Sequence, residues 1–330
     1  MIVITGGAGF IGSVLAWKFN VAGRRDLMLV DQKAESGPKW DNVRKLNFES
    51  YLESDAFIER LERKEFDGKI SAVFHMGACS DTTEMDTDYL RKNNTEYSQR
   101  IAEWCLRNGV YLAYASSAAT YGDGALGFSD DDALTPRLKP LNPYGQSKLD
   151  FDMWALKNGH EKRITGFRFF NVYGPHEYHK GHMRSLAHKG FEQIQRDGKL
   201  RLFKSYKKEY AHGGQKRDFV YVKDVVDAML WFYARRDVKG IYNLGSGSAE
   251  SWNDLAAALF KAMGRPENIE YIEMPETIKN QYQYFTEAAL SKLKRVGCPI
   301  TFRNLEVGIE DYVRMYLQKK NPFLSNSANF

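Results

Sequence analysis

Three glycines spaced three residues apart, among the four in the first twelve residues, constrain this chain more than any other feature. Residues 2–5, Ile-Val-Ile-Thr, form an apolar run that leads directly into Gly6, Gly9 and Gly12, and a helical pattern follows over residues 11–21. Glycine has no Cβ, so a strand can turn tightly into a helix and the turn can approach a phosphate closely. The free N–H groups at the start of the helix then face that phosphate. The segment predicts a strand–turn–helix unit that binds a dinucleotide.

An acidic residue follows the glycine loop at the distance expected for a ribose contact. Asp31 ends the apolar run 27–31, about 20 residues beyond the loop, where a carboxylate accepts hydrogen bonds from the adenosine ribose. A carboxylate there repels a 2′-phosphate and favours NAD. Lys33 and Lys39 follow in the same loop, however, and either could reach such a phosphate. The residues alone leave NAD and NADP open.

Short apolar runs alternate with helical patterns through the first half of the chain, and this alternation predicts an α/β fold. It is typical of a Rossmann-type, doubly wound parallel sheet with helices on both faces. The runs cover residues 2–5, 27–31, 72–75, 111–115 and 164–169, and the helical patterns cover 11–21, 56–63 and 95–108. Further apolar runs at 219–222 and 241–244 are candidates for one or two more strands.

Length and composition predict two joined units. The chain has 330 residues, about twice what one ordinary domain needs, and it is 43% hydrophobic and 27% charged, as soluble globular proteins are. Residues 172–216 and 247–330 break the alternation and are richer in basic, aromatic and glycine residues. We predict a Rossmann domain over 1–171, with 217–246 returning to it, and a smaller mixed α/β substrate-binding lobe over 172–216 and 247–330.

Charge and cysteine content argue against several other classes of protein. The net charge is only +5 with both signs interleaved, whereas a nucleic-acid groove is usually one-sidedly basic. No apolar run reaches the ~18 residues of a membrane span, and the N-terminus begins in an apolar strand rather than a signal peptide. The odd, widely spaced set Cys79, Cys105 and Cys298 fits neither a disulfide framework nor zinc. We expect a cytoplasmic protein with a small-molecule substrate.

A tyrosine and a lysine four residues apart form the predicted catalytic pair. Tyr144 and Lys148 lie at the start of a helical pattern, so the ammonium lies on the same face as the phenol. A cation and a positive nicotinamide ring both lower the pKa of a tyrosine from about 10. Ser117, at the end of the 111–115 strand, is placed to bond the hydroxyl that Tyr144 deprotonates. Tyr316 and Lys320 share the spacing, but no nucleotide loop accompanies them.

With these motifs in place, the chain resembles the extended short-chain dehydrogenase/reductase family, which modifies nucleotide-linked sugars. The resemblance covers essentially the whole chain, and its most specific parts are FHMGACSDTTEMD at 74–86 and NVYGPHEYHKGHM at 171–183. It implies inversion at C-6″ of an ADP-linked heptose, used for lipopolysaccharide core, by transient oxidation to a ketone and re-reduction. It also implies NADP as cofactor, with NAD tolerated, and a homopentamer.

The resemblance also assigns roles to individual residues. Tyr144 and Lys180 would act as acid/base groups on opposite sides of the substrate, assisted by Ser117 and Lys148. The cofactor contacts expected from the glycine loop and the resemblance are Gly6, Gly9, Phe10, Ile11, Gly12, Asp31, Gln32, Lys39, Met76, Gly77, Ala78, Cys79, Ser80, Asn93, Lys148, Val172 and Lys180. The implied substrate contacts are Ser117, Asn171, His182, Lys189, Phe203, Lys204, Ser205, Tyr206, Arg217 and Tyr282.

Other interpretations of the same residues are weaker. His176, His179 and His182 are spaced three apart, which spreads their rings around a helix, and no cysteine or carboxylate cluster accompanies them, so we expect no metal. Cys79 has no paired histidine and is interpreted as a packing residue. A dehydratase would need an acid in the turn 118–121, which is Ala-Ala-Thr-Tyr. A 4-epimerase, a reductase or a non-catalytic NADP-binding protein stays open, although the last class tends to lose the Tyr/Lys pair.

Overall fold

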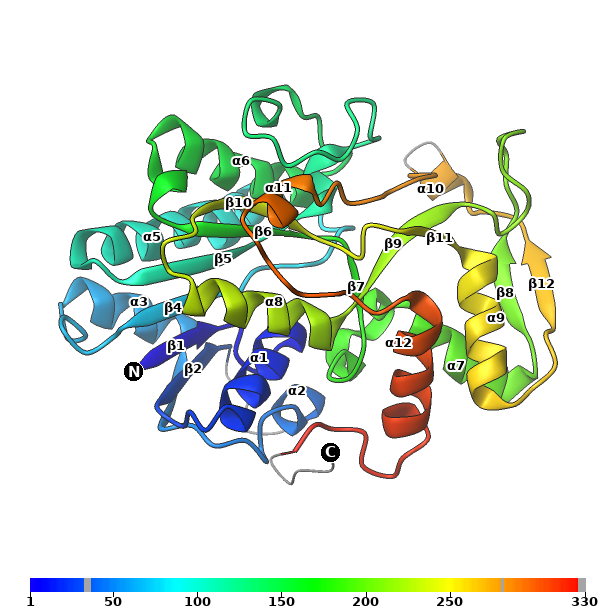
Figure 1. Ribbon diagram of the computed structural model, residues 1–330, viewed down its shortest axis with the longest axis horizontal. Helices are drawn as coiled ribbons and strands as arrows, with labels where there is room; N and C mark the ends of the chain where they lie inside the picture. Colours follow the sequence, from blue (N-terminus) through cyan, green and yellow to red (C-terminus); the bar gives the residue numbers. More distant parts are fainter. Residues whose placement is uncertain (33–36, 280–281, 326–330) are drawn as a thin grey trace.

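The computed structural model describes residues 1–32, 37–279 and 282–325. Within these residues a seven-stranded, fully parallel sheet forms the centre, in the order β10-β6-β5-β4-β1-β2-β3 (Figure 1). Its strands are β1 (Ile2–Thr5), β2 (Leu27–Asp31), β3 (Ser50–Glu53), β4 (Ala72–His75), β5 (Tyr111–Ser117), β6 (Thr165–Phe169) and β10 (Gly240–Leu244). The strand order reverses between β1 and β4, and this is where doubly wound sheets bind ligands.

Helices cover both faces of this sheet because its inner strands are apolar on both sides. Every residue of β1, β2 and β4 is buried. Ile2 and Ile4 pack into the core that holds α1 (Phe10–Val21) and α8 (Val222–Ala234). Val3 points the other way, into the core with α3 (Ser54–Glu62), α5 (Tyr97–Asn108) and α6 (Pro143–Lys157). The predicted doubly wound α/β fold is confirmed.

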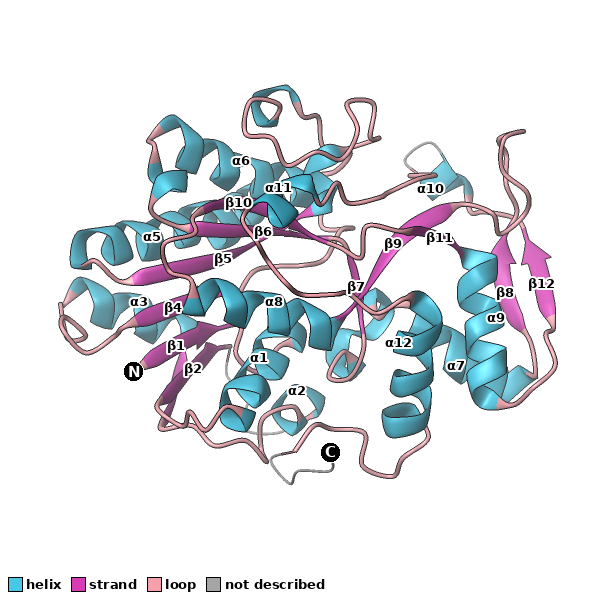
Figure 2. Ribbon diagram, viewed as in Figure 1, coloured by secondary structure: helices cyan, strands magenta, loops and turns pink. Residues whose placement is uncertain are grey.

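Two small sheets lie beyond the central one, on the right of Figure 2. In one, β7 (Asn171–Tyr173) is parallel to β9 (Lys216–Tyr221), which pairs antiparallel with β11 (Ala249–Ser251); in the other, β8 (Leu200–Phe203) pairs with β12 (Ile269–Ile272). A separate core joins these strands to α7 (Leu186–Asp197), α9 (Trp252–Met263) and α12 (Leu305–Tyr312). The remaining short helices are α2 (Pro38–Asp41), α4 (Thr87–Leu90), α10 (Glu276–Lys279) and α11 (Ser291–Arg295).

Of the two further candidate runs, 241–244 joins the central sheet as β10, and a strand at 50–53 was missed. The run 219–222 does not join the central sheet, because β9 pairs with β7 and β11, and Val222 already begins α8. The edge strand β3 has the sequence Ser-Tyr-Leu-Glu and none of its residues is buried, so it lacks the apolar signature that marks the inner strands.

The predicted division into 1–171 with 217–246, and 172–216 with 247–330, stays a prediction. Leu293 and Leu324, from the proposed second lobe, pack in the same core as α1 and α8. The last third of the chain therefore contributes to both parts of the molecule. No helix in the described part of the chain is both long enough and apolar enough to cross a membrane.

Candidate active site

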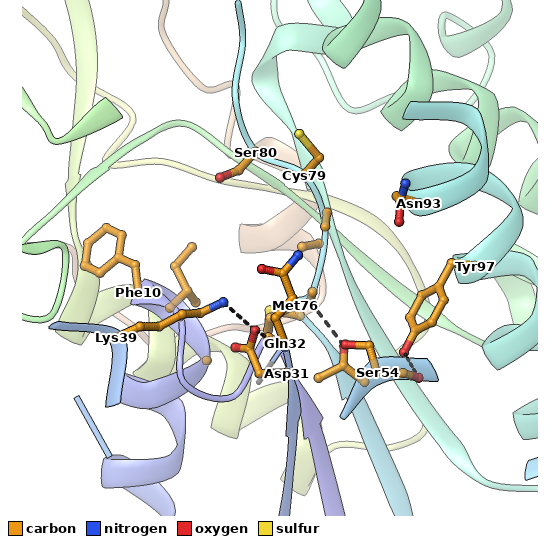
Figure 3. Close-up of a pocket in the computed structure, with 18 of the residues that line it drawn as sticks. Phe10, Asp31, Gln32, Lys39, Ser54, Met76, Cys79, Ser80, Asn93 and Tyr97 are labelled. Atoms are coloured by element: carbon orange, nitrogen blue, oxygen red, sulfur yellow. Dashed lines mark hydrogen bonds and ion pairs between the residues drawn. The ribbon is translucent and has the colours of Figure 1, made fainter. Parts of the chain in front are cut away.

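Two clefts open side by side at the carboxyl ends of β1, β2, β4 and β5. The first, which we name the glycine-loop cleft, has a volume of about 470 Å³ and is lined by Gly6, Gly9 and Gly12 with Asp31. The second, the Tyr144 cleft, has a volume of about 560 Å³. They share a wall formed by Phe10, Ile11, Met76, Ala78, Ser80, Ala115 and Lys180. Figure 3 shows Phe10, Met76 and Ser80 in the glycine-loop cleft.

The glycine loop has the close contacts that its sequence predicts. Gly6 has a φ of +62°, and a Cβ there would lie 2.7 Å from the Gly77 nitrogen. A Cβ at Gly12 would lie 2.2 Å from the Gly6 carbonyl oxygen. Gly9 caps α1 and has no side chain to accept from the first N–H groups of the helix, so the helix N-terminus is available to an anion. The loop therefore fits the pyrophosphate of a dinucleotide.

Asp31 both anchors the loop and holds a lysine in the cleft. Its Oδ2 accepts a hydrogen bond from the Ala8 N–H at 3.0 Å, and its Oδ1 accepts one from the Gln32 N–H at 2.8 Å. The Lys39 ammonium forms an ion pair with the same Oδ1, as the dashed line in Figure 3 shows. A cation and a carboxylate thus stand together where an adenosine ribose would lie. Lys33 lies outside the described residues.

Most residues expected to contact the cofactor line the glycine-loop cleft. These are Gly6, Gly9, Phe10, Ile11, Gly12, Asp31, Gln32, Lys39, Met76, Gly77, Ala78, Cys79, Ser80, Asn93 and Lys180. Lys148 and Val172 line the Tyr144 cleft instead. The sequence analysis missed Thr5, Glu53, Ser54, Asp55, Tyr89, Tyr97, Ala115 and His179. Residues 53–55 escaped notice because they lie at the carboxyl end of β3; had that strand been predicted, its end would have indicated them.

Tyr144 and Lys148 lie on the first turns of α6. Asn142 caps this helix by accepting a hydrogen bond from the Gly145 N–H at 2.7 Å, and Pro143 occupies the first helical position. One turn later, the Lys148 ammonium donates to the Ala115 carbonyl oxygen at 2.9 Å, which fixes it against β5. Ser117 ends β5, and its hydroxyl accepts a hydrogen bond from the Ala119 N–H at 3.1 Å. Ser117 therefore caps a turn while its hydroxyl also faces the cleft.

The pKa values at this site differ from the sequence expectation. Burial raises the pKa of the Tyr144 phenol, and the nearby Ser117 hydroxyl opposes the rise. Burial also lowers the pKa of Lys148 to about 8, although the Asp152 carboxylate works against this. In the protein by itself the Tyr144 pKa is therefore raised rather than lowered, because desolvation of the phenol is the largest cause of its shift. The positive ring of a nicotinamide is the other source that we expected to lower it.

Lys180 reaches the site from a different element. It lies in the 3₁₀ turn Tyr178–Met183 between β7 and α7 and lines both clefts. Its ammonium lies 5.5 Å from the centre of the Phe10 ring. Burial lowers the pKa of Lys180, the Glu177 carboxylate raises it, and the Lys189 ammonium lowers it further. The Tyr144 cleft thus brings together the Tyr144 phenol and the Lys180 amine from separate parts of the chain.

The residues expected to contact the substrate divide into two groups. Ser117, Asn171 and Lys189 line the Tyr144 cleft. His182, Phe203, Lys204, Ser205, Tyr206, Arg217 and Tyr282 are not among the residues that line it. His182 is exposed beside Asp81, with 3.4 Å between its Nε2 and the carboxylate.

Several of the more distant substrate candidates are engaged with one another or with the protein. Lys204 forms an ion pair with Glu273 at 2.6 Å, and the Tyr206 hydroxyl bonds the same carboxylate. The Ser205 N–H donates to His212. Phe203 packs edge-on against Tyr282. The structure therefore does not bring residues 203–206 into the Tyr144 cleft.

Arg217 lies behind the cleft wall, buried between two rings. Its guanidinium lies 5.6 Å from the Trp252 ring and 5.2 Å from the Tyr282 ring, and Trp252 lines the Tyr144 cleft. It donates one hydrogen bond, to the Lys216 carbonyl oxygen at 2.8 Å. Burial lowers the pKa of this guanidinium. Among the described side chains no carboxylate pairs with it, which leaves a buried cation available to an anion.

The three spaced histidines do not converge. His176 bonds Ser13 and Leu324, His179 bonds Asn42, and His182 faces Asp81. The described residues contain no group of three or more potential metal ligands. Cys79 is held through its backbone by the Asn94 amide, and burial raises the pKa of its thiol, so it is not activated as a nucleophile.

A glycine-rich turn at the switch point of a doubly wound sheet, beside a Ser/Tyr/Lys group at the next strand end, defines a nicotinamide-dependent enzyme of the short-chain dehydrogenase type. The model of the NAD dependent epimerase/dehydratase family matches residues 2–245, and the chain belongs to that family.

Relatives and solved structures agree with this membership. The chain is 50% identical to the ADP-L-glycero-D-manno-heptose-6-epimerase of Nitratidesulfovibrio vulgaris strain DP4, over 98% of this chain and 100% of that protein. The ADP-L-glycero-D-manno-heptose-6-epimerase of Helicobacter pylori has a similar structure, with a TM-score of 0.75 at 27% identity over 95% of both chains. The structure of MoeE5 in complex with UDP-glucuronic acid and NAD is also similar, with a TM-score of 0.72 at 26% identity over 95% of this chain and 99% of that one.

Proposed function

We propose that this protein converts ADP-D-glycero-D-manno-heptose to ADP-L-glycero-D-manno-heptose by inverting the configuration at C-6″. The name of its relatives at up to 50% identity over nearly the full length supports this substrate. The observation that carries the proposed chemistry is that Tyr144 and Lys180, from separate elements, line one cleft that shares a wall with the glycine-loop cleft.

Inversion at an unactivated carbon needs an oxidised intermediate. It also needs one group to take the proton from the hydroxyl and another to return a proton when the intermediate presents its other face. A bound nicotinamide would accept the hydride in the first half-reaction and return it in the second. The Tyr144 phenolate accepts the proton of the C-6″ hydroxyl as the ketone forms, with Ser117 and Lys148 orienting the hydroxyl and the phenol. The ketone then turns within the cleft to present its other face. Lys180 donates a proton to the carbonyl oxygen in that second orientation, and solvent exchange resets both groups, so no oxidant is consumed overall.

We assign NADP as the resident cofactor, with NAD as the alternative. The family description supports a nicotinamide dinucleotide, and Lys39 places a cation beside Asp31 at the ribose end of the glycine-loop cleft. Denaturing the purified protein and identifying the released nucleotide by chromatography tests this assignment. Lys39→Ala should weaken NADP binding at least tenfold and NAD binding little, because only NADP carries the 2′-phosphate. Equal losses of affinity for NADP and NAD would refute the assignment of Lys39 as the contact for the 2′-phosphate.

The sugar nucleotide is proposed to extend from the Tyr144 cleft toward Arg217. Asn171, His182 and Lys189 would contact the heptose, and Arg217 would hold the diphosphate. Residues 203–206 and Tyr282 would contact the nucleotide beyond it. The buried guanidinium of Arg217, which has no carboxylate partner among the described side chains, supports this direction, because such a group favours an anionic ligand.

We further propose that the protein acts in the cytoplasm in the synthesis of lipopolysaccharide core precursors, as a homopentamer. Sedimentation equilibrium of the purified protein measures the oligomeric state, and a mass of five chains is expected.

Incubating the protein with ADP-D-glycero-D-manno-heptose, and following the C-6″ configuration by NMR, tests the function. An equilibrium mixture of both epimers is expected without added cofactor. Inversion at C-4 of another nucleotide sugar, with no change at C-6″, would favour a 4-epimerase. Retained nucleotide with no turnover of any sugar nucleotide would favour a non-catalytic binding protein.

A further inference from the structure

The loop that carries Lys180 contains a buried residue in an unfavourable backbone conformation. His176 has a φ of +78° and no exposed surface. Among the described residues, Lys64 is the only other non-glycine residue with positive φ, and it is exposed. A residue with a Cβ keeps this left-handed conformation only where its surroundings fix it. The contacts that fix His176 therefore also fix the loop.

The His176 imidazole links two distant segments through a chain of hydrogen bonds that all run in one direction. Its Nε2 accepts from the Leu324 backbone N–H at 2.9 Å, so the neutral ring carries its proton on Nδ1 and donates to the Ser13 hydroxyl at 2.9 Å. Ser13 in turn donates to the Gly9 carbonyl oxygen at 2.6 Å. Burial lowers the pKa of His176 to about 3, so the ring stays neutral. One side chain thus joins the C-terminal segment to the glycine loop.

Further contacts hold the same loop from both sides. The buried amide of Asn42 donates to the Ala8 and His176 carbonyl oxygens at 2.9 and 3.2 Å. The Tyr178 hydroxyl donates to the Pro322 carbonyl oxygen at 2.8 Å, and Phe323 packs on the His176 and Tyr178 rings. Figure 1 shows the chain after α12 running back beneath α1 and α2. The segment 321–325 and the first turn of α1 therefore enclose the Lys180 loop.

The Lys180 ammonium has no such anchor of its own. Among the described residues, none forms a hydrogen bond or ion pair with its Nζ, which lies 5.5 Å from the centre of the Phe10 ring. Its backbone N–H bonds the Glu177 carbonyl oxygen at 3.0 Å. The place of the ammonium at the wall between the two clefts is therefore set by the backbone of the loop.

We propose that His176 is a positioning residue that, by joining segment 321–325 to the first turn of α1, holds Lys180 in reach of the substrate. This inference rests on the proposed role of Lys180 as the second acid/base group. The inference gives segment 321–325 an indirect part in catalysis, although this segment lines neither cleft. A displacement of about 1 Å in a catalytic group costs on the order of 100-fold in rate.

His176→Asn tests the proposal, because asparagine tolerates the left-handed conformation but is too short to span Ser13 and Leu324. We expect kcat for epimerisation to fall ~10- to 100-fold while KM and bound cofactor change less than about threefold. In a Lys180→Met background, the same substitution should lower kcat by less than about threefold further. Lys64→Asn, at the other left-handed position, is the matched control and should leave kcat unchanged.

Hydrogen exchange of residues 174–185 supplies a readout that needs no turnover. In His176→Asn this segment should exchange faster while β4 and α6 keep their protection. An unchanged kcat in an active enzyme, or a full additional loss in the Lys180→Met background, would overturn the proposal. If the wild-type protein does not turn over ADP-heptose, the proposed function fails, and unchanged exchange in 174–185 would then separately overturn the positioning of the loop.

Discussion

Replacing Arg217 by lysine tests how the protein holds the diphosphate of its substrate. Arg217 is 7% exposed, its guanidinium lies 5.6 Å from the Trp252 ring and 5.2 Å from the Tyr282 ring, and it has no carboxylate partner among the described side chains. A lysine keeps the charge but loses both the contact of the planar guanidinium with the two rings and one arm of a two-point contact with phosphate.

The magnitude follows from these two losses. A hydrogen bond to a charged group contributes about 1.5–3 kcal/mol, and a cation–π contact about 0.5–2 kcal/mol. Because lysine recovers part of each, we expect a net loss of about 2–3 kcal/mol in substrate binding, or ~30- to 150-fold. The diphosphate is bound equally in the ground and transition states, so the loss should raise KM and leave kcat within about threefold.

Steady-state kinetics with ADP-heptose, together with cofactor content, measure this effect. Arg201→Lys is a matched control, because Arg201 is a partly exposed arginine that pairs with Asp197 and Glu270. Arg217→Met adds a second readout: removing a buried charge that has no carboxylate partner among the described side chains should leave the thermal midpoint of the free protein unchanged or higher. An unchanged KM in Arg217→Lys, with a large loss of stability in Arg217→Met, would refute the reasoning and make Arg217 a structural residue.

Four further outcomes are expected. The purified protein should retain its nicotinamide nucleotide through many turnovers; accumulation of reduced nucleotide with a need for fresh cofactor would contradict an epimerase. Tyr144→Phe and Lys180→Met should each lose ~10²–10⁴-fold in epimerisation while still binding cofactor, as measured by NMR and fluorescence; near-normal activity in Lys180→Met would place the second base elsewhere. Gly12→Ala should abolish cofactor binding in a titration, because its Cβ would lie 2.2 Å from the Gly6 carbonyl oxygen; normal affinity would contradict the tight turn. Burial lowers the pKa of Lys148 to about 8, so raising the pH through that value removes its charge and kcat should fall on the alkaline side; a flat profile to pH 10 would exclude a role for this charge.

Local stereochemistry and hydrophobic periodicity were enough to predict the core of the fold and part of the site. β1, the glycine turn and α1 follow from an apolar run and three glycines, and the close approach of Gly12 to Gly6 explains why no larger residue fits. The inner strands are buried on both faces, so their apolar runs mark them directly. Tyr144 and Lys148 meet on one helix face because they are four residues apart.

The tertiary structure decided what depends on contacts between distant segments. β3 is a partly exposed edge strand without an apolar signature, and the partner of β9 is set by β7 and β11 rather than by its own sequence. The raised pKa of Tyr144 comes from burial, which no spacing reveals. The contact of Leu324 with His176 joins residues 148 positions apart in the sequence. A local sequence pattern indicates which backbone conformation a segment prefers. Which other segment it packs against depends on the packing of the whole chain.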